Sequence, residues 1–252
     1  MKITFLGTSG SVLTKENSYP SILLNDDLLL DCGEGTTQKL LHLNSIDSIH
    51  TICFSHLHND HILGLFSLLW YYWINGRREK ISIIGPKGIK DTFEQIIKLI
   101  HTPPDMKSCE LEYRELEISN SINSISMGYA MEYVHMEHSI PTIAYKIMEK
   151  DVAMCYAGDT KPNRNLKELS EDCELLICES TFPDDQKEIA HKYNHSTPSD
   201  VISIAKEVNC KNVALTHISP PYREIVKKDK ERLSKDFNGK IIIAEDLLSL
   251  SL

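Results

Sequence analysis

The sequence predicts one layered α/β domain that spans residues 1–252. Short apolar runs with strand character alternate with segments of helical period, a pattern typical of sheets covered by helices. With 252 residues, of which 41% are hydrophobic, the chain can bury one large core. No low-complexity segment or Pro/Gly/Ser-rich linker divides it, so no domain boundary is expected.

The first half of the chain is predicted to alternate strands with helices. The expected strands are 2–6, 21–24, 28–30, 51–55 and 81–84. The second and third of these form a hairpin, because the residues between them, Asn25-Asp26-Asp27, are typical turn residues. The expected helices are 36–43, a helix through the 60s, and 89–100.

The second half continues with more strands. Residues 110–134 alternate in strand fashion between Asn and Ser turns, and 142–148 pairs with 152–156 as a second hairpin around Glu149-Lys150-Asp151. The later strands are expected at 175–178, 213–216 and 240–244. The later helices are expected at 185–193 and 198–208, with a charged helix within 222–237.

The two halves resemble each other in plan. The strand 28–30 runs into Asp31-Cys32-Gly33, and the strand 152–156 runs into Ala157-Gly158-Asp159. Likewise, a histidine follows both the 51–55 strand and the 213–216 strand. This pattern favours two similar βα halves that face each other with a site between them.

Composition excludes some classes of function. The net charge of −9 counts against broad, non-specific nucleic-acid binding, which relies on Lys and Arg, although metal ions could still attract a phosphate. The longest apolar stretch, 62–74, is too short to span a bilayer, and the first residues lack a signal-peptide layout. A cytoplasmic protein with no membrane partner is therefore expected. Its seven scattered cysteines are expected to be free thiols, mostly in the core.

The segment His56-Leu57-His58-Asn59-Asp60-His61 is the strongest functional signal. It places three imidazoles and one carboxylate directly after an apolar strand. Imidazole and carboxylate are the ligands that zinc prefers. A loop at a strand end can direct all four side chains into one cleft, so we predict a metal site here.

Three further residues at strand ends could complete this site: His138, Asp159 and His217. His135 is a rival to His138, and the residues alone leave the choice open. Together with the loop they supply five histidines and two aspartates, enough for two metals if Asp159 is shared. Two metals roughly 3.5–4 Å apart suit hydrolysis, because a water between them loses its proton near neutral pH.

Several motifs occur in an order that resembles the metallo-β-lactamase superfamily and, within it, the ribonuclease Z group of tRNA 3′-processing endonucleases. They are Asp31-Cys32-Gly33-Glu34-Gly35-Thr36, the His56–His61 loop, Glu137-His138-Ser139, Gly158-Asp159-Thr160, His195-Ser196-Thr197 and Leu215-Thr216-His217-Ile218-Ser219. The resemblance covers residues 1 to about 222. It implies an αββα four-layer sandwich and a homodimer.

The resemblance also implies roles for single residues. One zinc would be held by His56, His58 and His138, the other by Asp60, His61 and His217, with Asp159 bridging them and Mn²⁺ as a possible substitute. Asp31 would orient a ligand histidine. Asp60 would be the general base and His195 would protonate the leaving oxygen or bind the scissile phosphate. Ser196 and Thr197 would contact the substrate phosphate.

One departure from the group's pattern bears on the substrate. Common ribonuclease Z proteins carry a long basic arm between the third histidine and the bridging aspartate, whereas only twenty residues separate His138 from Asp159 here. The sequence therefore predicts a phosphodiesterase that cleaves RNA, with small phosphodiesters as the alternative substrates. Two weaker alternatives are an enzyme that hydrolyses a thioester, lactone or lactam, and a non-catalytic scaffold protein.

Overall fold

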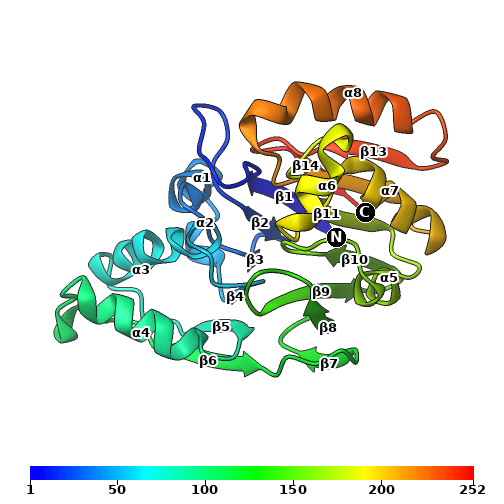
Figure 1. Ribbon diagram of the computed structural model, residues 1–252. Coiled ribbons are helices and arrows are strands. Elements are labelled where there is room, and N and C mark those ends of the chain that lie inside the picture. Colours follow the sequence, from blue (N-terminus) through cyan, green and yellow to red (C-terminus); the bar gives the residue numbers. More distant parts are fainter.

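The computed structural model describes residues 1–252 and contains two mixed seven-stranded sheets (Figure 1). The first sheet has the order β14-β1-β2-β3-β4-β5-β6. Its strands are β1 (Lys2–Gly7), β2 (Ser21–Leu24), β3 (Leu28–Leu30), β4 (Thr51–Cys53), β5 (Ile81–Pro86), β6 (Leu111–Leu116) and β14 (Ser249–Ser251). β3 through β6 run parallel, so their carboxyl ends lie along one edge.

The second sheet has the order β13-β12-β11-β10-β9-β8-β7. Its strands are β7 (Asn123–Ser126), β8 (Ala130–Met136), β9 (Thr142–Glu149), β10 (Val152–Tyr156), β11 (Leu175–Glu179), β12 (Asn212–Thr216) and β13 (Lys240–Ile243). β10 through β13 run parallel. β8 points the same way as β10, because each is antiparallel to β9.

Helices cover the outer face of each sheet, which gives four layers (Figure 1). The helices are α1 (Thr36–His42), α2 (Asn59–Ile62), α3 (Gly64–Ile74), α4 (Ile89–Leu99), α5 (Arg164–Leu169), α6 (Lys187–Lys192), α7 (Pro198–Glu207) and α8 (Arg223–Leu233). Three cores hold the layers together. One joins α1, α3 and α4 to the first sheet, one lies between the sheets, and one joins α5, α7 and α8 to the second sheet. This confirms the expected αββα sandwich.

The two halves share a strand plan, with one correction to the sequence-based match. β1 through β6 and β8 through β13 have the same neighbours and relative directions, so β3 corresponds to β10, as expected. β4, however, corresponds to β11 rather than β12. The histidines that follow β4 and β12 therefore come from strands that are not equivalent, and the likeness in their sequences was misleading.

Three local features were missed. The helix through the 60s is divided at Leu63 into α2 and α3. Gly64, the first residue of α3, lies against the loop that follows β3, where a Cβ would be 1.9 Å from the carbonyl oxygen of Gly33. The short helix α5 is capped by the Asn163 side chain, which accepts a hydrogen bond from the Leu166 amide. β14 forms only by pairing with β1, a long-range contact.

Two expectations from composition agree with the structure. None of the helices has the length and apolar character that a bilayer span requires. All seven cysteines are free and buried, as expected for small core residues.

Candidate metal centre

The candidate ligands gather where the carboxyl ends of strands from both sheets meet. Asp31 follows β3, His56 follows β4, Asp159 comes shortly after β10, and His217 follows β12. Ligand sites in α/β proteins commonly lie at this end of parallel strands. The remaining loop residues are at the start of the short helix α2, and His138 comes shortly after β8.

Three histidines form the first group. The Nδ1 atom of His58 lies 3.0 Å from Nε2 of His56 and 3.2 Å from Nε2 of His138. His135 belongs to none of the ligand groups, and its Nδ1 lies 3.2 Å from the carbonyl oxygen of Thr142. Of the two rivals in the sequence, the structure therefore brings His138 to the cluster.

Asp60, His61 and His217 form the second group. Oδ2 of Asp60 lies 3.4 Å from Nε2 of His217 and 4.0 Å from Nε2 of His61. Burial alone would raise the pKa of Asp60, but before any metal binds the hydrogen bond from His217 and the charge of a protonated His61 lower it. The carboxylate is thus ionised at neutral pH, which suits a metal ligand better than a proton acceptor.

Asp159 lies between the two groups. Its Oδ1 is 3.4 Å from Nε2 of His61, and its Oδ2 is 3.3 Å from His217, 3.9 Å from His56 and 4.0 Å from His138. Gly158 allows this approach, because its φ is +61° and a Cβ there would lie 2.7 Å from that of Ser55. The carboxylate is in position to bridge two ions.

Asp31 is the buried anchor behind the first loop. Its Oδ2 accepts hydrogen bonds from Nδ1 of His61 at 2.7 Å, the Ser55 hydroxyl at 2.8 Å and the Tyr156 hydroxyl at 2.6 Å, and its Oδ1 accepts one from the Ser55 amide. With a cation bound, His61 donates from Nδ1 to Asp31 and its Nε2 offers a lone pair to the cluster. This is the orienting contact that the resemblance implied for Asp31.

Three other histidines have their tautomers set in the same way. The Ser55 hydroxyl is already donated to Asp31, so it accepts from Nδ1 of His56 at 2.9 Å. Nδ1 of His138 donates to the carbonyl oxygen of Asn194 at 3.3 Å. The Thr181 hydroxyl donates to Glu179 and accepts from Nδ1 of His217 at 2.9 Å. Each histidine therefore presents a bare Nε2 to the cluster.

These residues fit a pair of divalent cations. Nε2 of His61 is buried and has no hydrogen-bond partner, an arrangement that is costly for a polar atom without a ligand. The donor atoms of each group lie within 4.8 Å of one another. Neutral imidazoles and carboxylates are the donors that zinc, and also manganese, accept.

His195 lies beside the cluster and is held by Glu179. Its Nδ1 is 2.8 Å from Oε1 of Glu179, a carboxylate that is almost fully buried. Burial alone would lower the pKa of His195, but the negative charge and hydrogen bond of Glu179 outweigh burial and raise the pKa to about 9. His195 is therefore positively charged at neutral pH and able to donate a proton.

Sequence reasoning missed Glu179. The signal was weak: one acidic residue at the end of the apolar run 175–178, sixteen positions before His195. The same carboxylate also accepts hydrogen bonds from the Thr160 amide at 2.8 Å, the Ser196 amide at 3.1 Å and the Thr181 hydroxyl. Glu179 thus connects the loops that carry Asp159, His195 and His217.

Replacing Glu179 by Gln is expected to lower the pKa of His195 from about 9, because the neutral amide no longer stabilises the imidazolium while burial still disfavours it. The charged state of His195 would then be lost at lower pH than in the wild type. An NMR titration of the histidine ring signals measures this shift. An unchanged pKa would contradict the assigned pairing.

The expected phosphate contacts of Ser196 and Thr197 are corrected by the structure. The Ser196 hydroxyl donates to the carbonyl oxygen of Thr160 at 2.6 Å. Thr197 is the N-cap of α7, and its hydroxyl bonds to Asp200 at 3.0 Å. Both residues are buried, and neither lines the cleft. Their hydroxyls fix the backbone beside His195 instead.

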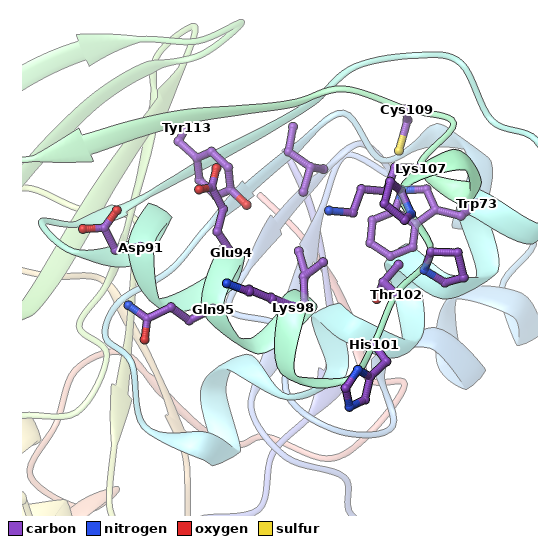
Figure 2. Close-up of a pocket in the computed structure, with 14 residues that line it drawn as sticks. Trp73, Asp91, Glu94, Gln95, Lys98, His101, Thr102, Lys107, Cys109 and Tyr113 are labelled. Carbon is purple, nitrogen blue, oxygen red and sulfur yellow. The ribbon is translucent and has the colours of Figure 1, made fainter.

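The cluster opens into a cleft of about 690 Å³, lined by side chains that include His58, Asp60, His138, Asp159 and His195. A larger cavity of about 830 Å³ lies between α4 and the segment leading into β6. Figure 2 shows its polar side chains, from Asp91 to Lys98, spread along α4 rather than directed at one point. No group of three metal-ligating residues lies there, so the chemistry belongs to the smaller cleft.

Comparisons with known proteins agree with this geometry. Residues 27–218 match the family described as "Beta-lactamase superfamily domain". The protein named Ribonuclease Z from Methanococcus aeolicus is 33% identical to this chain, over 100% of the chain and 98% of the relative. The chain belongs to the ribonuclease Z family. It is accordingly a metal-dependent hydrolase.

Two further members show the same likeness. Ribonuclease Z from Haloarcula marismortui is 30% identical, over 98% of the chain and 95% of the relative. The crystal structure of the short form of human tRNase Z is 26% identical with a TM-score of 0.84, over 100% of this chain and 99% of that one. The match therefore extends through the whole sandwich.

The archaeal ribonuclease Z relatives are longer than this chain. The alignment with the Haloarcula protein runs over 295 positions, to which this chain contributes 98% of its 252 residues, so about 48 positions have no counterpart here. Within this chain, β9 and β10 almost fill the connection between His138 and Asp159.

Proposed function

We propose that the protein is a zinc-dependent endoribonuclease that removes the 3′ trailer of precursor tRNA and leaves a 3′-hydroxyl. The observation that carries the proposal is the convergence of five imidazoles and two carboxylates beside His195, which Glu179 holds at 2.8 Å. The names of the relatives, Ribonuclease Z and human tRNase Z, support the substrate. Such a role implies a cytoplasmic location.

In this proposal the two groups hold one ion each. His56, His58 and His138 would hold the first, Asp60, His61 and His217 would hold the second, and Asp159 lies where it could serve both. Two divalent cations would supply positive charge at the scissile phosphate and lower the pKa of a water held between them. Asp31, through its contact with Nδ1 of His61, would keep Nε2 of that ring directed at the second group.

The protein's own acid is His195. Its Nδ1 is occupied by Glu179, and no protein atom is hydrogen-bonded to its Nε2. Because the imidazole is charged at neutral pH, Nε2 can donate a proton to the oxygen that leaves as the RNA is cut. Asp60 is proposed mainly as a ligand, held by the Ser11 amide at 3.3 Å, and secondarily as the proton acceptor.

The test is cleavage of a precursor tRNA that carries a 3′ trailer, with zinc or manganese bound. We expect one cut that yields a 3′ end open to ligation. His138→Ala should abolish it, whereas the matched change His135→Ala should retain it, because only His138 contacts the cluster. Absence of cleavage by the metal-loaded wild type would contradict the proposal.

A phosphodiesterase for small substrates is the second candidate. It is favoured by the roughly 48 positions that this chain lacks, because fewer residues remain to contact a large RNA. The net charge of −9 also disfavours binding of a large RNA. Hydrolysis of bis(p-nitrophenyl) phosphate without cleavage of any precursor tRNA would support this candidate over the first.

We also propose that the protein is a homodimer. Leu63, the N-cap of α3, is followed at helical spacing by Trp70 and Ile74 on that helix, and their exposed fractions are 40%, 43% and 63%. An exposed apolar stripe of this kind suits a subunit interface. Trp70→Glu combined with Ile74→Glu is expected to yield monomers in light scattering at micromolar concentration.

The matched control for the dimer is Ile189→Glu, which changes an equally exposed apolar residue on α6. It should leave the mass of the assembly unchanged. A wild-type protein that is monomeric throughout the measured range would overturn the homodimer proposal.

A further inference from the structure

Aromatic side chains line one wall of the catalytic cleft. The ring centres of Phe182 and Tyr222 are 5.7 Å apart with an angle of 36° between the planes. The ring of Phe182 is also 5.9 Å from that of His195. All three residues line the cleft, and Phe182 and Tyr222 are each half-buried. A partly exposed apolar surface thus lies directly beside the proposed acid.

The positions of both rings are fixed by the catalytic framework. Phe182 follows Thr181, whose hydroxyl is bonded to Glu179 and His217. Tyr222 ends the short 3₁₀ turn Pro220–Tyr222, and its amide donates to the carbonyl oxygen of Ser219 at 2.9 Å. The two rings therefore come from loops that start at the candidate metal centre, and they are held at a set place relative to it.

Beyond the proposed cations and His195 at the scissile phosphate, this cleft offers little positive charge to hold the rest of an RNA strand. Lys192 is the only lysine or arginine among the residues that line it, and the chain as a whole is acidic. Attraction of phosphates by Lys and Arg normally dominates nucleic-acid affinity. A cleft without such residues needs another source of binding, and stacking of a base on an aromatic ring is a strong one.

We propose that Phe182 and Tyr222 form a stacking platform for the unpaired nucleobase next to the scissile phosphate. The inference rests on the proposed cleavage of RNA and adds how the nucleotide at the cut is recognised. A base in a duplex is stacked on both sides and cannot reach the rings. The platform therefore selects single-stranded nucleotides with little preference among the four bases.

The test combines enzyme variants with an abasic substrate. Phe182→Leu and Tyr222→Leu remove a ring and keep an apolar side chain. Two substrates are used, each with an abasic ribose in place of the nucleotide on one side of the scissile bond. We expect each change alone to lower kcat/KM about tenfold, mainly through KM. Combining them should cost no more than either alone, because both remove the same stack.

Tyr193→Leu is the matched control, since Tyr193 lines the same cleft, with its ring close to the Lys192 ammonium. It should lose the same factor on the abasic substrate as the wild type does. If the losses caused by Phe182→Leu and by Tyr222→Leu each add fully to the loss caused by the abasic substrate, the platform is overturned. The same holds if only Tyr193→Leu shows a less than additive loss.

Failure of the proposed function is separately visible. If the metal-loaded wild type cuts no RNA, binding of a dinucleotide and of its abasic analogue is measured by calorimetry. Preference for the intact dinucleotide that disappears in Phe182→Leu would still support the platform. Equal binding of the two ligands to the wild type would exclude it.

Discussion

His195→Ala is expected to lower kcat for RNA cleavage by about 10²–10⁴-fold, the usual contribution of a positioned acid. The substitution removes the imidazole that Glu179 binds beside the cluster and keeps charged. Neither proposed metal group loses a ligand, so bound zinc should remain at the wild-type level. Single-turnover cleavage of precursor tRNA measures the effect on the chemical step.

The leaving group provides a sharper version of this experiment. p-Nitrophenolate leaves readily without a proton, so hydrolysis of bis(p-nitrophenyl) phosphate should fall far less than RNA cleavage in the same variant. His191→Ala is the matched control, because His191 contacts Asp200 rather than the cleft. Equal losses on the two substrates would show that His195 does not act as the acid.

Asp31→Asn is expected to weaken metal binding by about 10–100-fold, as changes behind a ligand histidine commonly do. The carboxylate accepts four hydrogen bonds while fully buried. An amide has one oxygen, so in either orientation its NH₂ group meets a donor. One of the donors, such as the Nδ1 hydrogen of His61, then loses its acceptor. Without that hydrogen bond, the His61 ring is no longer held in one orientation. Competition with a chelator measures the affinity.

Asp27→Asn is the control for Asp31→Asn. Asp27 immediately precedes β3, at the opposite end of the strand from Asp31, and accepts a hydrogen bond from the Tyr129 hydroxyl at 2.6 Å. Its replacement should lower thermal stability slightly and leave zinc affinity unchanged. If Asp31→Asn behaves in the same way, Asp31 is a structural residue and does not position a ligand.

Much of the candidate site is readable from the sequence, because its residues follow apolar strands. The His56–His61 loop has its ligands in one short segment, and Asp159 and His217 follow strands whose carboxyl ends meet. Glu179 escaped notice because its partner, His195, is reached through a loop and a helix. No spacing rule relates such residues.

Side-chain direction is the other limit. Ser196 and Thr197 adjoin His195 in the sequence, yet the backbone turns both hydroxyls into the protein, where Thr160 and Asp200 accept them. The requirement for glycine at position 64 has a similar origin, since a side chain there would collide with the carbonyl group of Gly33. Both outcomes follow from tertiary packing, which local patterns do not contain.

The metal content of the folded protein tests the central claim most directly. Elemental analysis after equilibration with zinc and removal of excess ion should give two zinc ions per chain. His58→Ala combined with His138→Ala removes two ligands of the first group only, and this variant should retain one ion. A correctly folded wild-type protein that binds no zinc, or a double variant that still binds two ions, would contradict the account.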